Sequence, residues 1–210
     1  MWRRALVTAG VTATAIGAVE YRGFVAGAVA ASAFWLAARL RPRAPRADAD
    51  VTPDTLSREL LDAVPEWLAV HDLPVDGRSV DHVVVTPLAV LAVQTAWWGR
   101  ASEADHARRR EQAVEQARRD ARAVKTLLAS RAVGFDLPVW PVVLTWGPGA
   151  EDSQAGLVDV VSGADAGAWA MAYSSGAIAP SVAERVHGAL LRVQARRDGQ
   201  RTKAQHARAA

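Results

Sequence analysis

The chain has 210 residues, of which 50% are hydrophobic, and a formal net charge of +3 at pH 7. This length allows one globular domain of ordinary size and an additional segment. The sequence has no cysteine, which fits a reducing compartment without proving it. Its five histidines lack metal-ligand spacing, and neither a Gly-rich phosphate loop nor a Ser/His/Asp arrangement supports a nucleotide-binding or triad-hydrolase class.

The first 40 residues predict a transmembrane hairpin. Residues 5–19 and 23–38 are free of charge, and the turn between them, residues 20–22, carries one Glu and one Arg. As helices that rise roughly 1.5 Å per residue, both runs fall short of the ~30 Å hydrocarbon core, so flanking residues must contribute. The aromatic residues that can anchor at the interface are Trp2, Tyr21 and Trp35.

Two other interpretations of this segment stay open. A cleaved signal peptide fits the basic start and the small residues of the second run, but the arginines just after that run argue against export. A single tilted span would bury Glu20 and Arg22 near its middle, which is costly. The hairpin leaves arginines on the near side of both spans, so it predicts an inner-membrane protein whose soluble domain lies in the cytoplasm.

Charge is distributed unevenly along the chain. Residues 1–46 carry seven Arg and one Glu, and residues 192–210 carry six basic residues and one acid. Residues 100–131 are also basic, whereas residues 47–99 and 132–191 are acidic. The basic balance therefore comes from the membrane flank, one helix and the tail, and attraction to anionic lipid is the simplest explanation for the flank.

After a basic Pro- and Ala-rich linker at residues 41–53, the sequence predicts a small α/β domain at residues 54–170 and a C-terminal helix with a basic tail at residues 171–210. Apolar residues at helical spacing predict the first helix, for which Asp54 is the expected N-cap. The expected order is helix, three strands, long helix, strand. Helices are expected at 54–64, 102–130 and 181–197, and strands at 67–75, 79–86, 89–95, 137–146 and 156–161.

Two of the expected strands carry residues that a core strand does not need. Asp81 stands beside His82 inside the apolar run of the second strand. The third strand ends in Gln94 and Ala96, which are two positions apart and are therefore expected on one face of the sheet. A charged residue in a buried strand suggests a catalytic or metal-binding cluster, but the expected acidic and basic partners are missing from the third strand.

The stretch "HDLPVDGRSVDHVVVTPLAVLAV", residues 71–93, resembles the NERD family, the nuclease-related domain, which is similar to the restriction-endonuclease-like PD-(D/E)xK superfamily. The family typically shows Ile-Asp-His-Val-Val-Val, a Gly-Pro-Ser-Gly turn and an apolar strand leading to Glu-x-Lys or Asp-x-Lys. A second match is "EQARRDARAVKTLL" followed by "PVWPVVLTW". The resemblance covers about residues 54–170 and implies a restriction-endonuclease-like α/β core.

Carried over residue by residue, the resemblance places the family's strand aspartate on Asp81 and its helix glutamine on Gln116. The early acidic residue falls on Asp54, with Glu59 as a near alternative. The family's second acidic residue and its lysine fall on Gln94 and Ala96, so the chain reads "VQTA" where an active site would read "VETK".

This departure disfavours metal-dependent phosphodiester hydrolysis. Gln94 lacks the negative charge that favours Mg²⁺ over bulk water, and Ala96 neither orients water nor stabilises developing charge. Losing such a group typically costs about 10² to 10⁴ in rate. We therefore expect a degenerate site without a cofactor, in a domain that acts as a binding or scaffold module. A weak or conditional nuclease that uses Mg²⁺ or Mn²⁺ at Asp81 is the alternative, and a purely structural membrane protein is a third class.

Several residues near this site could contact nucleic acid, and each has a structural alternative. Trp97 and Trp98 could stack on bases, although strand-end tryptophans are more often part of the core. The arginines that could follow a phosphate backbone are Arg100, Arg108, Arg109 and Arg110, but interspersed acids favour a solvated, salt-bridged helix face. Asp81 itself could be a polar strand residue that accepts hydrogen bonds. The expected partners are the membrane and either non-specific nucleic acid or an unidentified protein.

Overall fold

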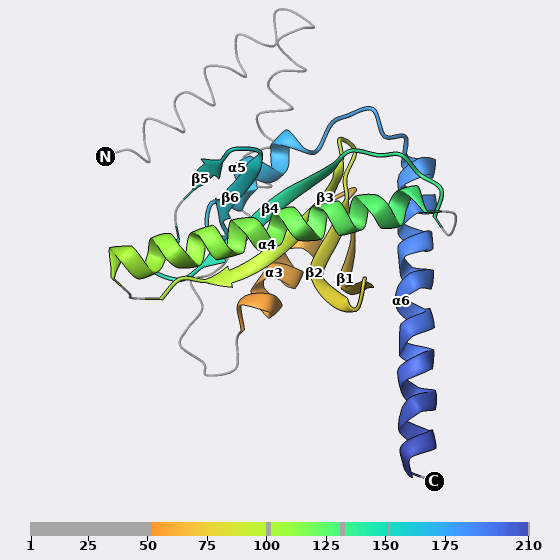
Figure 1. The fold of residues 1–210 in the computed structure, drawn as a ribbon. Coiled ribbons are helices and arrows are strands. Elements are labelled where there is room, and N and C mark those ends of the chain that lie inside the picture. The colour runs from red at the N-terminus through yellow and green to blue at the C-terminus, as the bar shows by residue number, and fades with distance from the viewer. Residues whose placement is uncertain (1–51, 100–101, 131–132, 151, 210) are drawn as a thin grey trace, which may run out of the picture. The chain divides into compact units, whose positions relative to one another are not determined.

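The computed structural model describes residues 52–99, 102–130, 133–150 and 152–209. The predicted hairpin, almost all of the linker and Arg100 lie outside these ranges, and none of the helices within them is long and apolar enough to cross a membrane. The described residues all fall within one compact unit, and the helices and strands carry the labels of Figure 1.

A mixed six-stranded sheet forms the centre of this unit. Its strand order is β1-β2-β3-β4-β6-β5. The β2 strand pairs antiparallel with both β1 and β3, the β3, β4 and β6 strands are parallel, and β5 pairs antiparallel with β6. The strands are β1 (Leu68–Val75), β2 (Arg78–Val85), β3 (Val90–Trp97), β4 (Val139–Trp146), β5 (Ser153–Ala155) and β6 (Val158–Ser162).

Helices cover both faces of the sheet, with α4 on one side and α3 on the other (Figure 1). The α4 and α6 helices contribute Val124, Leu128, Val186 and Leu190 to a core cluster that also contains residues of the first three strands. The helices are α3 (Pro53–Asp62), α4 (Glu103–Ala129), α5 (Ala166–Ala172) and α6 (Pro180–Ala209). The α/β class and the order helix, three strands, long helix, strand agree with the sequence prediction.

The start of α3 differs from the prediction. Thr52, not Asp54, is the N-cap, because the Thr52 side chain accepts a hydrogen bond from the Thr55 amide at 3.2 Å. Pro53 then occupies the first turn, where its missing N–H costs nothing. Asp54 is left free to bond Arg58 one turn later, at 2.8 Å.

The alternation of side chains in β1 is interrupted at Asp72, whose φ is +54°. Val70 and Leu73, three positions apart, both belong to the core cluster on the α4 and α6 side. In an uninterrupted strand they would lie on opposite faces. The Asp72 carboxylate accepts a hydrogen bond from Arg58 at 2.5 Å, which helps to hold this conformation.

Three elements differ from the prediction. The β5 strand and the α5 helix were not predicted, because elements of three and seven residues leave no clear periodicity. The α6 helix is longer than predicted and continues to Ala209. Its extension carries charged and small residues instead of an apolar stripe, so the sequence pattern ended earlier than the helix.

Candidate functional site

The Asp81 carboxylate lies where the backbone pairing between β2 and β3 ends. The last paired residues are His82 and Val93. Beyond them, Asp81 Oδ2 accepts hydrogen bonds from Gln94 Nε2 at 2.6 Å and from the Thr95 amide at 2.9 Å. Gln94 Nε2 also donates to the Thr95 carbonyl oxygen at 3.2 Å, so two acceptors fix the orientation of the amide. The hydrogen-bond donors to Asp81 are therefore Gln94 and Thr95, both on β3.

Burial is the main influence on the Asp81 carboxyl group and raises its pKa above the ordinary value. The hydrogen bond from the Thr95 amide acts in the opposite direction. Among the neighbouring charges, Asp120 raises the pKa most, followed by Asp54 and Asp72. Asp81 is therefore a half-buried acid in an environment that already contains negative charge.

Gln94 and Ala96 lie on the same face of β3, as predicted from their spacing. Ala92 belongs to the core cluster shared with α4 and α6, and Ala96 packs against a second cluster that contains Val114 and Ala117 of α4. Gln94 lies between these two alanines on the strand, so its side chain faces α4. The two positions highlighted by the resemblance are thus both directed at the long helix.

Gln116 does not bond Asp81. Its Nε2 donates to Asp120 Oδ1 at 2.8 Å, and its Oε1 accepts from Arg119 Nη2 at 2.7 Å. Asp120, which sequence reasoning missed, is 2% exposed. Burial raises its pKa, while Gln116, Arg78 and Arg119 act to lower it. The sequence held one signal that Asp120 is buried, because it lies at helical spacing from the buried residues Ala117 and Val124 of α4.

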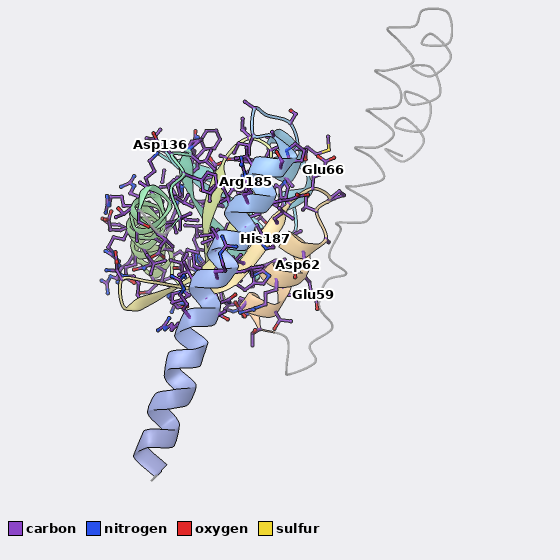
Figure 2. The ribbon with its side chains drawn as sticks, turned by 90° about the vertical axis from the view of Figure 1, so that its right-hand side faces the viewer. Glu59, Asp62, Glu66, Asp136, Arg185 and His187 are labelled. Atoms are coloured by element: carbon purple, nitrogen blue, oxygen red, sulfur yellow. The ribbon has the colours of Figure 1, made fainter. Side chains whose placement is uncertain are left out.

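Asp54 takes part in the polar contacts between α3 and the sheet. It bonds Arg58, and its Oδ1 is 3.6 Å from Nε2 of His82, a side chain that is completely buried. Glu59, the alternative to Asp54, is exposed on α3 (Figure 2). The predicted acidic residue of the first helix therefore contacts the histidine beside Asp81 and not Asp81 itself.

A chain of hydrogen bonds runs through the sheet beneath α3. His82 Nδ1 is 2.8 Å from His71 Nδ1, and His82 Nε2 is 3.0 Å from Thr95 Oγ1. Ser57 accepts from both Thr95 Oγ1 at 2.9 Å and Trp146 Nε1 at 2.8 Å. Burial, followed by the charge of His71, lowers the pKa of His82 to about 4. His82 is therefore a neutral buried group at neutral pH.

The candidates for nucleic-acid contact are not equally accessible. Trp97 is 48% exposed, whereas Trp98 is 6% exposed and belongs to the second core cluster, so it offers no free ring face. Arg108 and Arg109 are exposed on α4, and Arg110 is partly buried. Further along the same helix, Glu115 pairs with Arg118 and Arg122 at 3.7 and 3.5 Å.

Among the described residues, no group of three or more His, Cys, Asp or Glu side chains is arranged to hold a metal ion. The Asp81 site offers one carboxylate from β2 and the Gln94 carboxamide from β3, whose N–H group already bonds that carboxylate. One carboxylate and one engaged amide are a weak ligand set for Mg²⁺.

His82 makes stability depend on pH. In the unfolded chain its pKa is near 6.5, so between about pH 6.5 and pH 4 the unfolded state binds more protons and stability falls as the pH falls. We expect the urea unfolding free energy to drop by about 2 kcal/mol between pH 7.5 and pH 5 because of this residue. His82→Gln, although less stable at pH 7.5, should lose clearly less over the same interval. Equal losses in both proteins would contradict a buried neutral His82.

One family model matches the chain. Residues 54–146, from the first turn of α3 to the end of β4, match the nuclease-related domain, NERD. Neither the curated proteins nor the solved structures include a significant match to the chain. The matched segment holds Asp81, Gln94, Ala96 and Gln116, and the mixed sheet flanked by helices is compatible with a nuclease-like core. The chain therefore contains a nuclease-related domain of the NERD family at residues 54–146.

Proposed function

We propose that this nuclease-related domain is a non-catalytic binding or scaffold module that is anchored to the cytoplasmic face of the inner membrane. The hydrogen bond from Gln94 Nε2 to Asp81 Oδ2 carries the proposal. In a metal-dependent phosphodiesterase, a cation would compensate the strand aspartate and its acidic neighbour. Here two N–H donors of β3 compensate Asp81 instead.

Among the residues that the structure describes, the side chains that contact Asp81 also lack a group for the chemical step. Ala96 has no polar atom with which to position water or to stabilise the charge that develops on phosphorus. The two lysines of the chain are Lys125 and Lys203. Lys125 bonds the Asp136 carboxylate and the Leu137 carbonyl oxygen, next to the C-terminal end of α4, and is therefore engaged elsewhere.

The membrane part of the proposal rests on the sequence. Two uncharged runs at residues 5–19 and 23–38, with arginines beside the near end of each, favour a hairpin whose termini both lie in the cytoplasm. In that arrangement the linker at residues 41–53 tethers the domain close to anionic lipid.

We propose non-specific nucleic acid as the partner, held mainly by the C-terminal part of α6. Figure 1 shows that α6 continues well beyond the sheet. Val193 still packs against the core, and Gln194 Nε2 donates to the His71 carbonyl oxygen at 2.5 Å. The following residues 198–210 carry three basic side chains and one acid. Contacts from such a segment to phosphates would depend on salt and not on base sequence.

Plasmid cleavage tests the proposed loss of catalysis. The native protein should not nick plasmid DNA with Mg²⁺ or Mn²⁺. The double variant Gln94→Glu/Ala96→Lys restores a carboxylate and a cation two residues apart on the face toward α4, and detectable nicking is expected. Nicking should be absent from either single variant and from the triple variant that adds Asp81→Ala. Cleavage by the native protein that Asp81→Ala abolishes would contradict the proposal and favour a metal-dependent nuclease.

Salt dependence tests the proposed partner. A deletion of residues 198–210 spares the packing of Val193 and the hydrogen bond of Gln194, and it removes three cations. It should reduce the slope of log K against log [salt] for duplex DNA by up to about one unit for each phosphate that these cations neutralise. The charge-conserving variant Arg201→Lys/Arg208→Lys should keep the native slope. A native protein that binds no DNA even at low salt would contradict the nucleic-acid role and leave a protein as the better partner.

A further inference from the structure

An exposed tryptophan stands at the edge of the sheet where the parallel strands β3 and β4 end. Their last residues, Trp97 and Trp146, pair with each other and define the carboxyl edge. The Trp97 ring is 48% exposed and lies close to two glycines. A Cβ on Gly99 would be 3.3 Å from Trp97 Nε1, and a Cβ on Gly147 would be 3.3 Å from Trp97 Cε2. The indole is therefore accessible and already positioned by its neighbours, which lowers the entropy cost of binding through it.

The chain enters the domain at the carboxyl edge. The indole N–H of Trp146 donates to Ser57 Oγ, in the first half of α3, at 2.8 Å. The other end of α3 lies farther back over the sheet, because Asp62 Oδ1 is 3.2 Å from Nε2 of His71, in the middle of β1. The N-terminal end of α3 therefore points toward the carboxyl edge. Thr52, the first described residue, caps this end, so the linker reaches the domain here.

The α6 helix leaves the domain past the same edge. Just before it, the Ile178 amide donates to the Pro87 carbonyl oxygen in the turn that precedes β3, at 2.9 Å. Farther along, Gln194 Nε2 donates to the His71 carbonyl oxygen at 2.5 Å. The helix thus runs in the direction of β3, and Figure 1 shows it projecting beyond the sheet on the side where α3 begins.

Both chain segments that meet at the carboxyl edge are basic in sequence. Residues 39–46, which precede the entry at Thr52, carry four arginines and no acid. Residues 192–210, which include the projecting part of α6, carry six basic residues and one acid. Residues 39–51 separate the second uncharged run from Thr52 and reach at most about 45 Å at roughly 3.4 Å per residue. A hairpin in the bilayer would therefore keep the carboxyl edge near the lipid surface.

We propose that the carboxyl edge docks on the anionic surface of the bilayer, with the Trp97 indole at the level of the lipid headgroups. Tryptophan is enriched at membrane–water interfaces, because its ring is largely apolar and its N–H is a hydrogen-bond donor. Basic residues beside the membrane add attraction to anionic lipid. The inference rests on the proposed function, because it assigns the lipid-facing surface of a domain that the proposed function anchors to the membrane.

Nucleic acid is the competing occupant of this edge. An exposed tryptophan can also stack on bases, and the basic residues of α6 suit phosphates of either kind. The entry of the linker favours lipid, because the tether brings the bilayer to this edge permanently, whereas nucleic acid has to arrive from solution.

Spin labels at two tryptophan positions test the docking edge in the full-length protein. The chain has no cysteine, so Trp97→Cys and Trp140→Cys each accept a single nitroxide. Trp140 is the matched control, because it is 39% exposed and lies at the start of β4, at the opposite edge. In vesicles of phosphatidylcholine and phosphatidylglycerol, the label at position 97 should collide with lipid-soluble oxygen more often than with a water-soluble nickel complex. This oxygen-to-nickel ratio should be several-fold lower at position 140.

Tryptophan fluorescence checks the result without a label or a cysteine. In vesicles of the same composition made with brominated lipid, part of the emission of the native protein should be quenched. Trp97→Phe should reduce the quenched part, and Trp140→Phe should leave it unchanged. Equal nickel access at both labelled positions, or lipid contact at position 140 in place of position 97, would overturn the docking edge.

Extraction of the vesicles with alkaline carbonate separates this inference from the proposed function. Protein that is released contradicts the membrane anchor and, with it, the inference. Protein that stays in the vesicles while position 97 remains open to nickel overturns the docking edge alone. Protection of position 97 by added duplex DNA, where lipid gives none, would overturn lipid as the occupant and assign the edge to nucleic acid.

Discussion

The hydrogen bond from Gln94 Nε2 to Asp81 Oδ2, 2.6 Å long, decides what this part of the molecule can do. It bridges β2 and β3 where their backbone pairing stops, and the Thr95 amide reinforces it on the same oxygen. A half-buried carboxylate is thereby compensated by protein donors. A carboxylate in the Gln94 position would place two negative charges together, and only a cation or a proton would then relieve their repulsion.

The same two strands carry different polar arrangements on their two sides. Beneath α3, His82 bonds both His71 and Thr95, and Ser57 accepts from both Thr95 and Trp146. Beneath α4, by contrast, Asp120 keeps one buried oxygen without a partner among the described residues. The side toward α3 is a hydrogen-bonded network suited to stability, whereas the side toward α4 leaves the Asp120 Oδ2 atom without a hydrogen bond from the described residues.

Much of the fold follows from local sequence patterns. Two of these patterns, the alternation of apolar residues and the turn at Thr86, bring Asp81 and Gln94 together. Alternating apolar residues place Asp81 and Gln94 on neighbouring strands, and the tight turn begun by Thr86 sets these strands against each other: Thr86 Oγ1 bonds the Ala89 amide and carbonyl at 3.1 and 2.9 Å. Their direct hydrogen bond could not be predicted, because it depends on where the backbone pairing ends.

Other contacts had no local signal. The pairing of His71 with His82 requires the register between β1 and β2, and the change of face at Asp72 depends on a positive φ that the sequence does not reveal. Asp120 had only a weak signal, its helical spacing from Ala117 and Val124, because the arginines around it are typical of a solvated helix face. The α3 cap was missed because Asp54 and Thr52 are both good cap residues.

Thermal unfolding of Gln94→Glu, with and without Mn²⁺, tests most directly whether an amide has replaced a metal at Asp81. We expect Gln94→Glu to lower the unfolding midpoint at neutral pH and Mn²⁺ to restore it, because the cation relieves the repulsion between the two carboxylates. Gln94→Met removes the hydrogen bond without adding charge, so it should also lower the midpoint but should gain less from Mn²⁺. A Gln94→Glu protein as stable as the native one in metal-free buffer would contradict the account.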